Sequence, residues 1–240
     1  MSKAIIKSIV TIGLLALLMA APVAGASVNK SVTIEAGSES DGASSVNGSV
    51  TVAEGAVVNG EVSTVNGKVR IRDNARVGEA STVNGAVSVG DNVTADSLET
   101  VNGAVSVGEN SKIARMVGAV NGGISLESGT TVGGNVANVN GAIDITAAEV
   151  GGNVEMVNGN LYLRDGAVVK GDVVIEKPSF WSFSKKSDPP KIMIGPGSVV
   201  EGKIILEREV ELYVSESAEI GGVEGVMTMD DAIRFSGDSP

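Results

Sequence analysis

The sequence repeats one short motif through most of its length. Eight copies of Val-Asn, from Val28 to Asn158, follow one another at intervals of 18 or 19 residues, and from the second copy onward Gly follows each pair. A fixed period of this size is typical of a solenoid, in which each repeat forms one coil of a stacked rod. One coil cannot bury its apolar side chains alone, so neighbouring coils must share a core.

Each repeat carries the pattern of a short β-strand after the motif. Apolar residues lie four and six positions after the leading Val, and such alternation of β-branched residues predicts a strand. Parallel coils stack about 4.8 Å apart, so equivalent residues should form continuous aliphatic columns along the axis. The two columns are Val32, Val50, Val69, Val87, Val105, Ile124, Ile143 and Leu161, and Ile34, Val52, Ile71, Val89, Val107, Leu126, Ile145 and Leu163.

Three recurring bends predict a triangular coil. Asn-Gly is expected to form the first corner, because both residues tolerate positive φ, and the stacked Asn amides are expected to form a hydrogen-bonded ladder. The ladder residues are Asn47, Asn66, Asn84, Asn102, Asn121, Asn140 and Asn158. A second corner suited to positive φ carries Gly55, Asn74, Asn92, Asn110, Gly129 and Gly166, and Gly-containing segments such as 58–60 mark a third, looser bend.

These patterns predict an all-β fold, a single-stranded parallel β-helix with three sides and about ten coils. The coils are expected at residues 27–176 and 192–226, with a loop at 177–191 between them and a C-terminal tail or cap at 227–240. At about 4.8 Å per coil the rod would be about 45–50 Å long. Departures from an 18-residue coil favour a right-handed helix, although spacings of six residues also fit the left-handed hexapeptide helix.

The first 26 residues have the layout of a secretory signal peptide. Lys3 and Lys7 precede an apolar run from Ile9 to Met19, and small residues at 24–26 suit cleavage. The alternative is an uncleaved membrane anchor, but the run is short for a membrane span, so cleavage is favoured and no transmembrane segment is expected in the mature chain. Export to the periplasm or the cell surface is expected, and the absence of cysteine excludes a disulfide framework.

The charge of the chain bears on its partners. The net charge is −11 with the two leader lysines included, which disfavours binding to nucleic acid or anionic lipid. Self-association, end to end or lateral, is the favoured interaction, and an envelope polymer or protein is a further candidate partner.

Two segments resemble the bactofilin family of polymer-forming bacterial β-solenoids. Residues 165–176 (DGAVVKGDVVIE) and 195–206 (GPGSVVEGKIIL) show the Val-x-Gly-x-aliphatic bend of that family. The resemblance implies a three-sided right-handed β-helix that assembles end to end without nucleotide. Bactofilins are typically cytoplasmic or on the inner membrane face, whereas this chain carries an export signal.

The chemistry of the chain does not favour an enzyme, and no cofactor is expected. Histidine and cysteine are absent, which excludes His-dependent triads, thiol nucleophiles and N/S metal sites. Asp144, Arg70 and Tyr162 share an outward column but belong to different coils, so solvated surface residues are the favoured interpretation. Acidic residues also repeat beside the second corner. They could recruit a hard cation, but a hydrated edge is the favoured interpretation. These residues are Glu54, Asp73, Asp91, Glu109 and the more distant Asp165.

Two further surfaces are candidates for interaction. The loop holds Phe180, Trp181 and Phe183, which could contact a subunit, membrane or glycan, or could fold back on the rod. A strip of small outward residues, including Ser88 and Ser106, could allow close packing between rods. We expect an exported, structural, self-assembling β-solenoid of the bacterial cell envelope, with a monomeric binding module or adhesin using the aromatic loop as the alternative.

Overall fold

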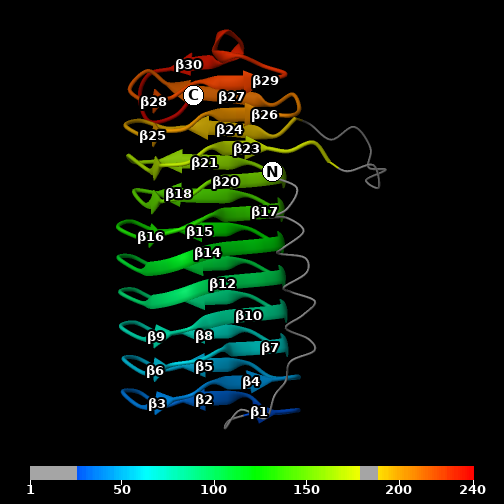
Figure 1. The fold of residues 1–240 in the computed structure, drawn as a ribbon, viewed down its shortest axis with the longest axis vertical. Helices are drawn as coiled ribbons and strands as arrows, with labels where there is room; N and C mark the ends of the chain where they lie inside the picture. The colour runs from blue at the N-terminus through cyan, green and yellow to red at the C-terminus, as the bar shows by residue number, and fades with distance from the viewer. Residues whose placement is uncertain (1–25, 179–188) are drawn as a thin grey trace.

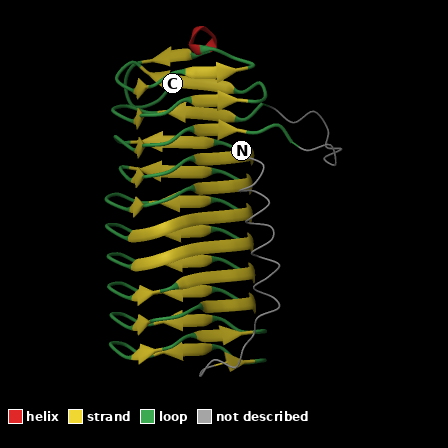
Figure 2. Cartoon of the chain, in the orientation of Figure 1, coloured by secondary structure: helices red, strands yellow, loops and turns green. Residues whose placement is uncertain are grey.

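The chain folds into a parallel β-solenoid of about ten turns (Figure 1). The computed structural model describes residues 26–178 and 189–240. Every strand pairing in this part is parallel, and Figure 2 shows the strands stacked one above another with short loops at the corners. The all-β β-helix predicted from the repeat is confirmed.

The first stack is a sheet of 11 strands, one from each coil. It contains the two aliphatic columns predicted from the sequence, whose partners lie directly in register, such as Val87 with Val105 and Val89 with Val107. Its strands are β2 (Val32–Ile34), β5 (Val50–Val52), β8 (Val69–Ile71), β11 (Val87–Val89), β13 (Val105–Val107), β15 (Ile124–Leu126), β18 (Ile143–Thr146), β21 (Leu161–Arg164), β24 (Lys191–Ile194), β27 (Glu211–Ser215) and β30 (Ile233–Phe235).

The second stack follows the corner at which Asn74, Asn92 and Asn110 adopt φ values of 61°, 57° and 55°. Gly55, Gly129 and Gly166 also have positive φ there, so the predicted second corner is confirmed. The strands of this stack are β3 (Glu39–Ser40), β6 (Val57–Val58), β9 (Arg76–Val77), β16 (Thr131–Val132), β19 (Glu149–Val150), β22 (Val168–Val169), β25 (Val199–Val200) and β28 (Glu219–Ile220).

The third stack ends at the Val-Asn-Gly motif. In two of its members the third bend is replaced by a continuous strand that also pairs with the second stack, so the two stacks form one sheet of 19 strands. Its strands are β1 (Ala26–Ser27), β4 (Ala43–Ser45), β7 (Val62–Asn66), β10 (Glu79–Asn84), β12 (Thr94–Asn102), β14 (Lys112–Asn121), β17 (Val136–Asn140), β20 (Val154–Asn158), β23 (Val173–Ile175), β26 (Ile204–Leu206) and β29 (Val223–Gly225).

The conformation expected for the motif Asn is wrong. Asn66, Asn84 and Asn102 are the last residues of extended strands, and none of them has positive φ. The motif glycines meet the expectation in part, because Gly103, Gly122, Gly141 and Gly159 have φ values of 158°, 153°, 144° and 135°. The bend also needs Gly because the preceding coil approaches closely. A Cβ at Gly85 would lie 1.8 Å from the carbonyl oxygen of Gly67.

The core is a column of aliphatic side chains enclosed by the three stacks. It runs from Ala43 to Val214 and includes Ile71, Leu98 and Leu163, each at most 2% exposed. Where the third stack presents a polar side chain inward, that side chain is hydrogen-bonded. Thr82 Oγ1, for example, donates to the carbonyl oxygen of Gly67 at 2.9 Å. The corner is therefore closed by a buried hydroxyl as well as by glycine.

The register continues beyond the eighth motif, as the sequence predicts. Leu161 pairs with Ile192 although 31 residues separate them, and Ile192 pairs with Leu212 in the next coil. The residues between β23, which ends at Ile175, and β24, which begins at Lys191, are therefore an insertion between two coils that keep the register.

The C-terminal segment covers the last coil. A 3₁₀ turn (Met229–Asp231) precedes β30, which pairs with β27 and places Arg234 opposite Val214. Phe235 is 7% exposed, and Met227 and Met229 pack against the core. Within the described residues, no helix is long and apolar enough to cross a membrane.

Candidate functional site

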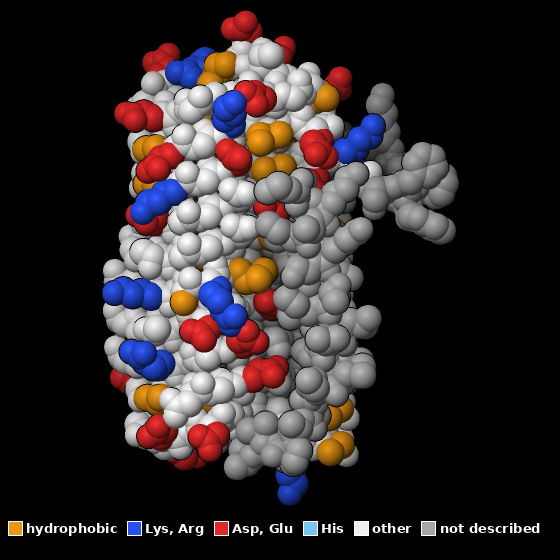
Figure 3. Space-filling model, in the orientation of Figure 1, with side chains coloured by type: hydrophobic (Ala, Val, Ile, Leu, Met, Phe, Trp, Pro, Cys, Tyr) orange, Lys and Arg blue, Asp and Glu red, His pale blue; other side chains and the backbone are white. Residues whose placement is uncertain are grey.

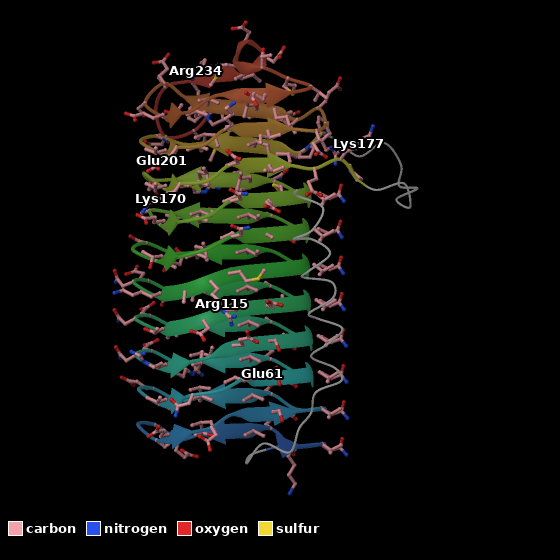
Figure 4. The ribbon with its side chains drawn as sticks, in the orientation of Figure 1. Glu61, Arg115, Lys170, Lys177, Glu201 and Arg234 are labelled. Atoms are coloured by element: carbon pink, nitrogen blue, oxygen red, sulfur yellow. The ribbon has the colours of Figure 1, made fainter. Side chains whose placement is uncertain are left out.

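The motif asparagines form one hydrogen-bonded ladder along an edge of the rod. Each Nδ2 donates to the Oδ1 of the Asn in the preceding coil, with distances of 2.8–3.0 Å. The row runs from Asn29 to Asn158, and its side chains are largely exposed. Side chains repeat from coil to coil in this way over much of the rod (Figure 4).

The acidic residues of the second corner lie in consecutive coils, but two of them bond to the backbone. Asp73 Oδ1 accepts from the backbone N–H of Asp91 at 3.0 Å, and Asp91 Oδ1 accepts from that of Glu109 at 2.8 Å. Glu54 accepts from Gly37 N through its own backbone carbonyl. Among the described residues, no group of three or more acidic side chains is placed to hold a metal ion.

A second side-chain-to-backbone series lies at the third bend, and sequence reasoning missed it. Asn135 Oδ1 accepts from Asn153 N, Asn153 Oδ1 from Asp172 N, and Asp172 Oδ1 from Lys203 N, all at 2.9 Å. The signal in the sequence is an Asn or Asp directly after a Gly of this bend, at Gly134, Gly152 and Gly171. This series supports the coils and brings no reactive groups together.

Asp144 and Tyr162 share an outward column, and both contact a residue of the adjoining outward column that the sequence did not indicate. Arg164 Nε donates to Asp144 Oδ1 at 3.0 Å, and its guanidinium lies 4.7 Å from the Tyr162 ring centroid. Arg70 is not part of this group, because Ser88, Ser106 and Ser125 separate it from Asp144 in the column. The arrangement is a surface ion pair beside an aromatic ring.

The strip of small residues faces outward on the first stack. Ser88 pairs with Ser106, which pairs with Ser125, and Ser88 and Ser106 are exposed. Phe180, Trp181 and Phe183 lie outside the described residues, as do the basic and apolar parts of the expected signal peptide.

The outer face of the third stack carries an apolar column that the sequence analysis did not assign to the surface. Strand β10 alternates so that Ala80 and Thr82 are buried, while Val83 lies outward and half-buried. The same position is 64% exposed at Val28 and 37% at Val46. We call this set the Val column: Val28, Val46, Val65, Val83, Val101, Val120, Val139 and Val157.

A cluster of charged residues lies beside the Val column near the middle of the rod. Arg115 forms an ion pair with Glu79, and Ser81 Oγ donates to Glu61 Oε1 at 3.3 Å. Burial raises the pKa of Glu99 to about 7, the Glu79 and Glu61 carboxylates add to the rise, and Arg115 opposes it. Figure 4 marks Glu61 and Arg115, and Figure 3 shows acidic and basic side chains mixed along the visible face.

Two further carboxylates on this face are more deeply buried. Glu155 is 1% exposed and Glu176 is 7% exposed. Burial raises the pKa of Glu155, a hydrogen bond from Asn153 opposes the rise, and the nearby Glu176 carboxylate adds to it. The sequence analysis predicted neither these buried carboxylates nor the Val column.

Comparisons with known proteins found no match to this chain. No family model matches it, and neither a curated protein nor a solved structure shows significant similarity.

Proposed function

We propose that the chain is a structural protein of the bacterial cell envelope that is exported and then assembles laterally with copies of itself. The layout of residues 1–26 and the resemblance of segments 165–176 and 195–206 to bactofilins support export and self-assembly. The side-chain clusters described above are ion pairs, ladders and backbone contacts, and these fit a structural role better than a catalytic one.

The Val column is the observation that carries this proposal. Valine occupies one outward position in eight successive coils, flanked on one side by the Asn ladder. An outward apolar row that extends over about 34 Å is unusual for a surface that faces only water. Its neighbours in the adjoining outward column are small in several coils, at Ser63, Ser81, Gly118 and Ala137, so a second flat surface could approach closely.

The C-terminal end of the rod favours lateral over end-to-end contact. At the C-terminal end, Arg234 lies over Val214 and places a charge where a further aliphatic residue would continue the column. Burying that charge in a new interface would cost free energy. The side of the rod has no such charge along the Val column itself.

The test is the assembly state of residues 27–240, a chain that retains every residue of the aliphatic core. We expect light scattering over a concentration series to show association, and negative-stain electron microscopy to show rods side by side. Replacing Val83 and Val120 with Glu should abolish the association, because it puts charges into the buried contact.

A matched control places the same charges on another face. Replacing Ser88 and Ser125 with Glu adds two carboxylates on the outer side of the first stack and should leave the association intact. A single rod of about 45–50 Å at all concentrations would refute lateral assembly.

A further inference from the structure

Three basic side chains form a row across the outer face of the first stack. Lys68, Arg70 and Arg72 occupy alternate positions in and beside β8, so all three point away from the core. The ion pairs found within the described residues include none of them. The strands on either side place only Thr51 and Ser88 next to Arg70. In a chain with a net charge of −11, such a row is suited to an acidic partner surface.

The same face carries an acidic residue at a matching distance from its middle. Ser106 lies two coils from Arg70, through Ser88. It also lies two coils from Asp144, through Ser125. Arg70 and Asp144 are therefore each about 9.6 Å from Ser106 along the axis, on opposite sides. A two-fold axis that passes through Ser106 parallel to the strands places Arg70 of one copy opposite Asp144 of a second copy.

The sizes of the side chains follow the same symmetry. Tyr162 and Met193 lie three and four coils from Ser106 on one side. Thr51 and Thr33 lie three and four coils away on the other side, so each large side chain meets a small one across the axis. The adjoining outward columns pair in the same way: Lys68 with Ala142, Arg72 with Thr146, Ala53 with Arg164, and Gly90 with Glu127.

The charges across the axis are complementary as well. Asp144 pairs with Arg164 of its own chain at 3.0 Å, and its carboxylate can accept further hydrogen bonds from Arg70 of the second copy. Glu127 of the second copy lies one coil step from the position opposite Arg72, so two acids face the basic row. Parallel rods in register fit poorly, because each basic row would then face the same row of the other copy.

We propose that two copies meet through the outer faces of their first stacks, antiparallel and related by a two-fold axis through Ser106. The contact runs from β2 to β24, which is eight coil steps or about 38 Å (Figure 1). It is largely polar, so it is weak between isolated rods and acts on rods that the Val column has already paired. The pairs then extend into ribbons. This extension rests on the proposed function, whereas the first-stack contact does not.

The test uses residues 27–240 with one introduced thiol, since the chain has no cysteine. Ser106→Cys places the thiols of the two copies side by side on the axis. Thr33→Cys, at an equally exposed position of the same face, places them about 38 Å apart. With a short bis-maleimide we expect at least about tenfold more covalent dimer for Ser106→Cys, the ratio that a free-energy difference of about 1.4 kcal/mol gives.

A charge exchange tests which groups meet. Arg70→Glu puts a carboxylate opposite Asp144 of the second copy and should lower the dimer yield of the Ser106→Cys chain to that of Thr33→Cys. Adding Asp144→Arg restores opposite charges across the axis and should recover the yield, which a loss of folding would not allow. Arg76→Glu reverses a charge in the same coil, on the outer side of β9, and should leave the yield unchanged.

A further pair of substitutions separates the two contacts. Ser88 lies opposite Ser125 across the proposed axis, so Ser88→Glu with Ser125→Glu sets like charges against each other there. The Val column is unchanged in this chain. Electron microscopy should therefore show rods that still pair but no longer extend into ribbons.

Two outcomes would overturn the proposal. Equal dimer yields for Ser106→Cys and Thr33→Cys would exclude the antiparallel register, and a yield that Asp144→Arg does not recover would show that Arg70 and Asp144 do not meet. If Ser106→Cys cross-links selectively but Val83→Glu with Val120→Glu leaves the association of rods unchanged, the proposed function fails and the first-stack contact stands. Equal yields in a chain that associates through the Val column give the reverse result.

Discussion

Asn102 Nδ2 donates to Asn84 Oδ1 at 3.0 Å, and Asn102 Oδ1 accepts from Asn121 Nδ2 at the same distance. Each interior member of the ladder therefore links three coils, whereas Asn29 at its start accepts one hydrogen bond, from Asn47. The ladder runs parallel to the axis, so it ties together the coil edges that the apolar core does not reach. It is a stabilising element rather than a reactive site.

The ladder predicts a position-dependent loss of stability. Asn102→Ala removes two side-chain hydrogen bonds and should lower the free energy of unfolding by about 1–3 kcal/mol. Asn29→Ala removes one exposed bond at the end of the row and should cost less than about 1 kcal/mol. Urea unfolding followed by circular dichroism measures both, and equal losses would contradict a stability contribution that follows the number of hydrogen bonds.

The loss of stability caused by a Gly→Ala substitution should differ between the motif and a corner outside it. Gly85→Ala would place a Cβ 1.8 Å from a backbone oxygen in the preceding coil, so the two coils must separate and the loss should exceed about 3 kcal/mol. Gly37→Ala meets no atom within 4 Å and costs only the strain of a φ of 64°, about 1 kcal/mol. Thermal unfolding of the two variants compares them, and similar melting temperatures would contradict the close approach.

The repeat determined the fold because its period of 18 or 19 residues is kept through eight successive copies. Two aliphatic columns at fixed positions after Val28 allow one stacking register, and β2 to β27 follow it. The outer face of the third stack was harder to predict, because apolar side chains are assumed to point inward. Here Thr82 is buried and its hydroxyl satisfies the Gly67 carbonyl, which turns Val83 outward. Composition and spacing do not give the strand register, and only the register shows that Thr82 points inward and Val83 outward.

The sequence also did not predict the burial of the Glu99 and Glu155 carboxylates. Glu99 and Glu155 fall in an outward column whose other members are small or apolar, such as Ser81, Gly118 and Val174. Acidic residues at outward positions are normally solvated, so nothing in the sequence marks these two for burial. Their environment depends on neighbours in other coils and adjoining columns.

The raised pKa of Glu99 predicts a pH-dependent stability. Its folded-state pKa of about 7 exceeds the ordinary value of 4.5, so the folded state holds the proton more tightly. The contribution of Glu99 is therefore most favourable below about pH 4.5 and is lost as pH rises toward and past 7, by about 1–3 kcal/mol. Glu99→Gln should flatten the stability profile between pH 5 and 8, measured by urea unfolding at several pH values.

A matched variant separates this effect from general charge removal. Glu109→Gln removes an exposed carboxylate at the second corner and should leave the slope between pH 5 and 8 as it is. An unchanged slope in Glu99→Gln would show that another group titrates in this range.

The C-terminal cap predicts that one end of the rod is held closed. Deleting residues 227–240 removes β30 and the 3₁₀ turn, so the edge of β27 and the ends of the Leu212 and Val214 columns become exposed. An unpaired strand edge over an open core promotes pairing with another chain. We expect the shortened chain to form end-to-end species longer than one rod, measured by sedimentation velocity and electron microscopy.

A point variant tests the same cap with the strand retained. Arg234→Val keeps β30 but replaces the charge over Val214 with an apolar side chain that continues the column. Because this change removes the charge that must be desolvated in an end-to-end contact, association should rise relative to the parent chain. Arg76→Val removes a positive charge from the exposed outer side of β9 and should have no effect on end-to-end association. If neither the deletion nor Arg234→Val alters the length of the particles, the end of the rod is closed by something other than this cap.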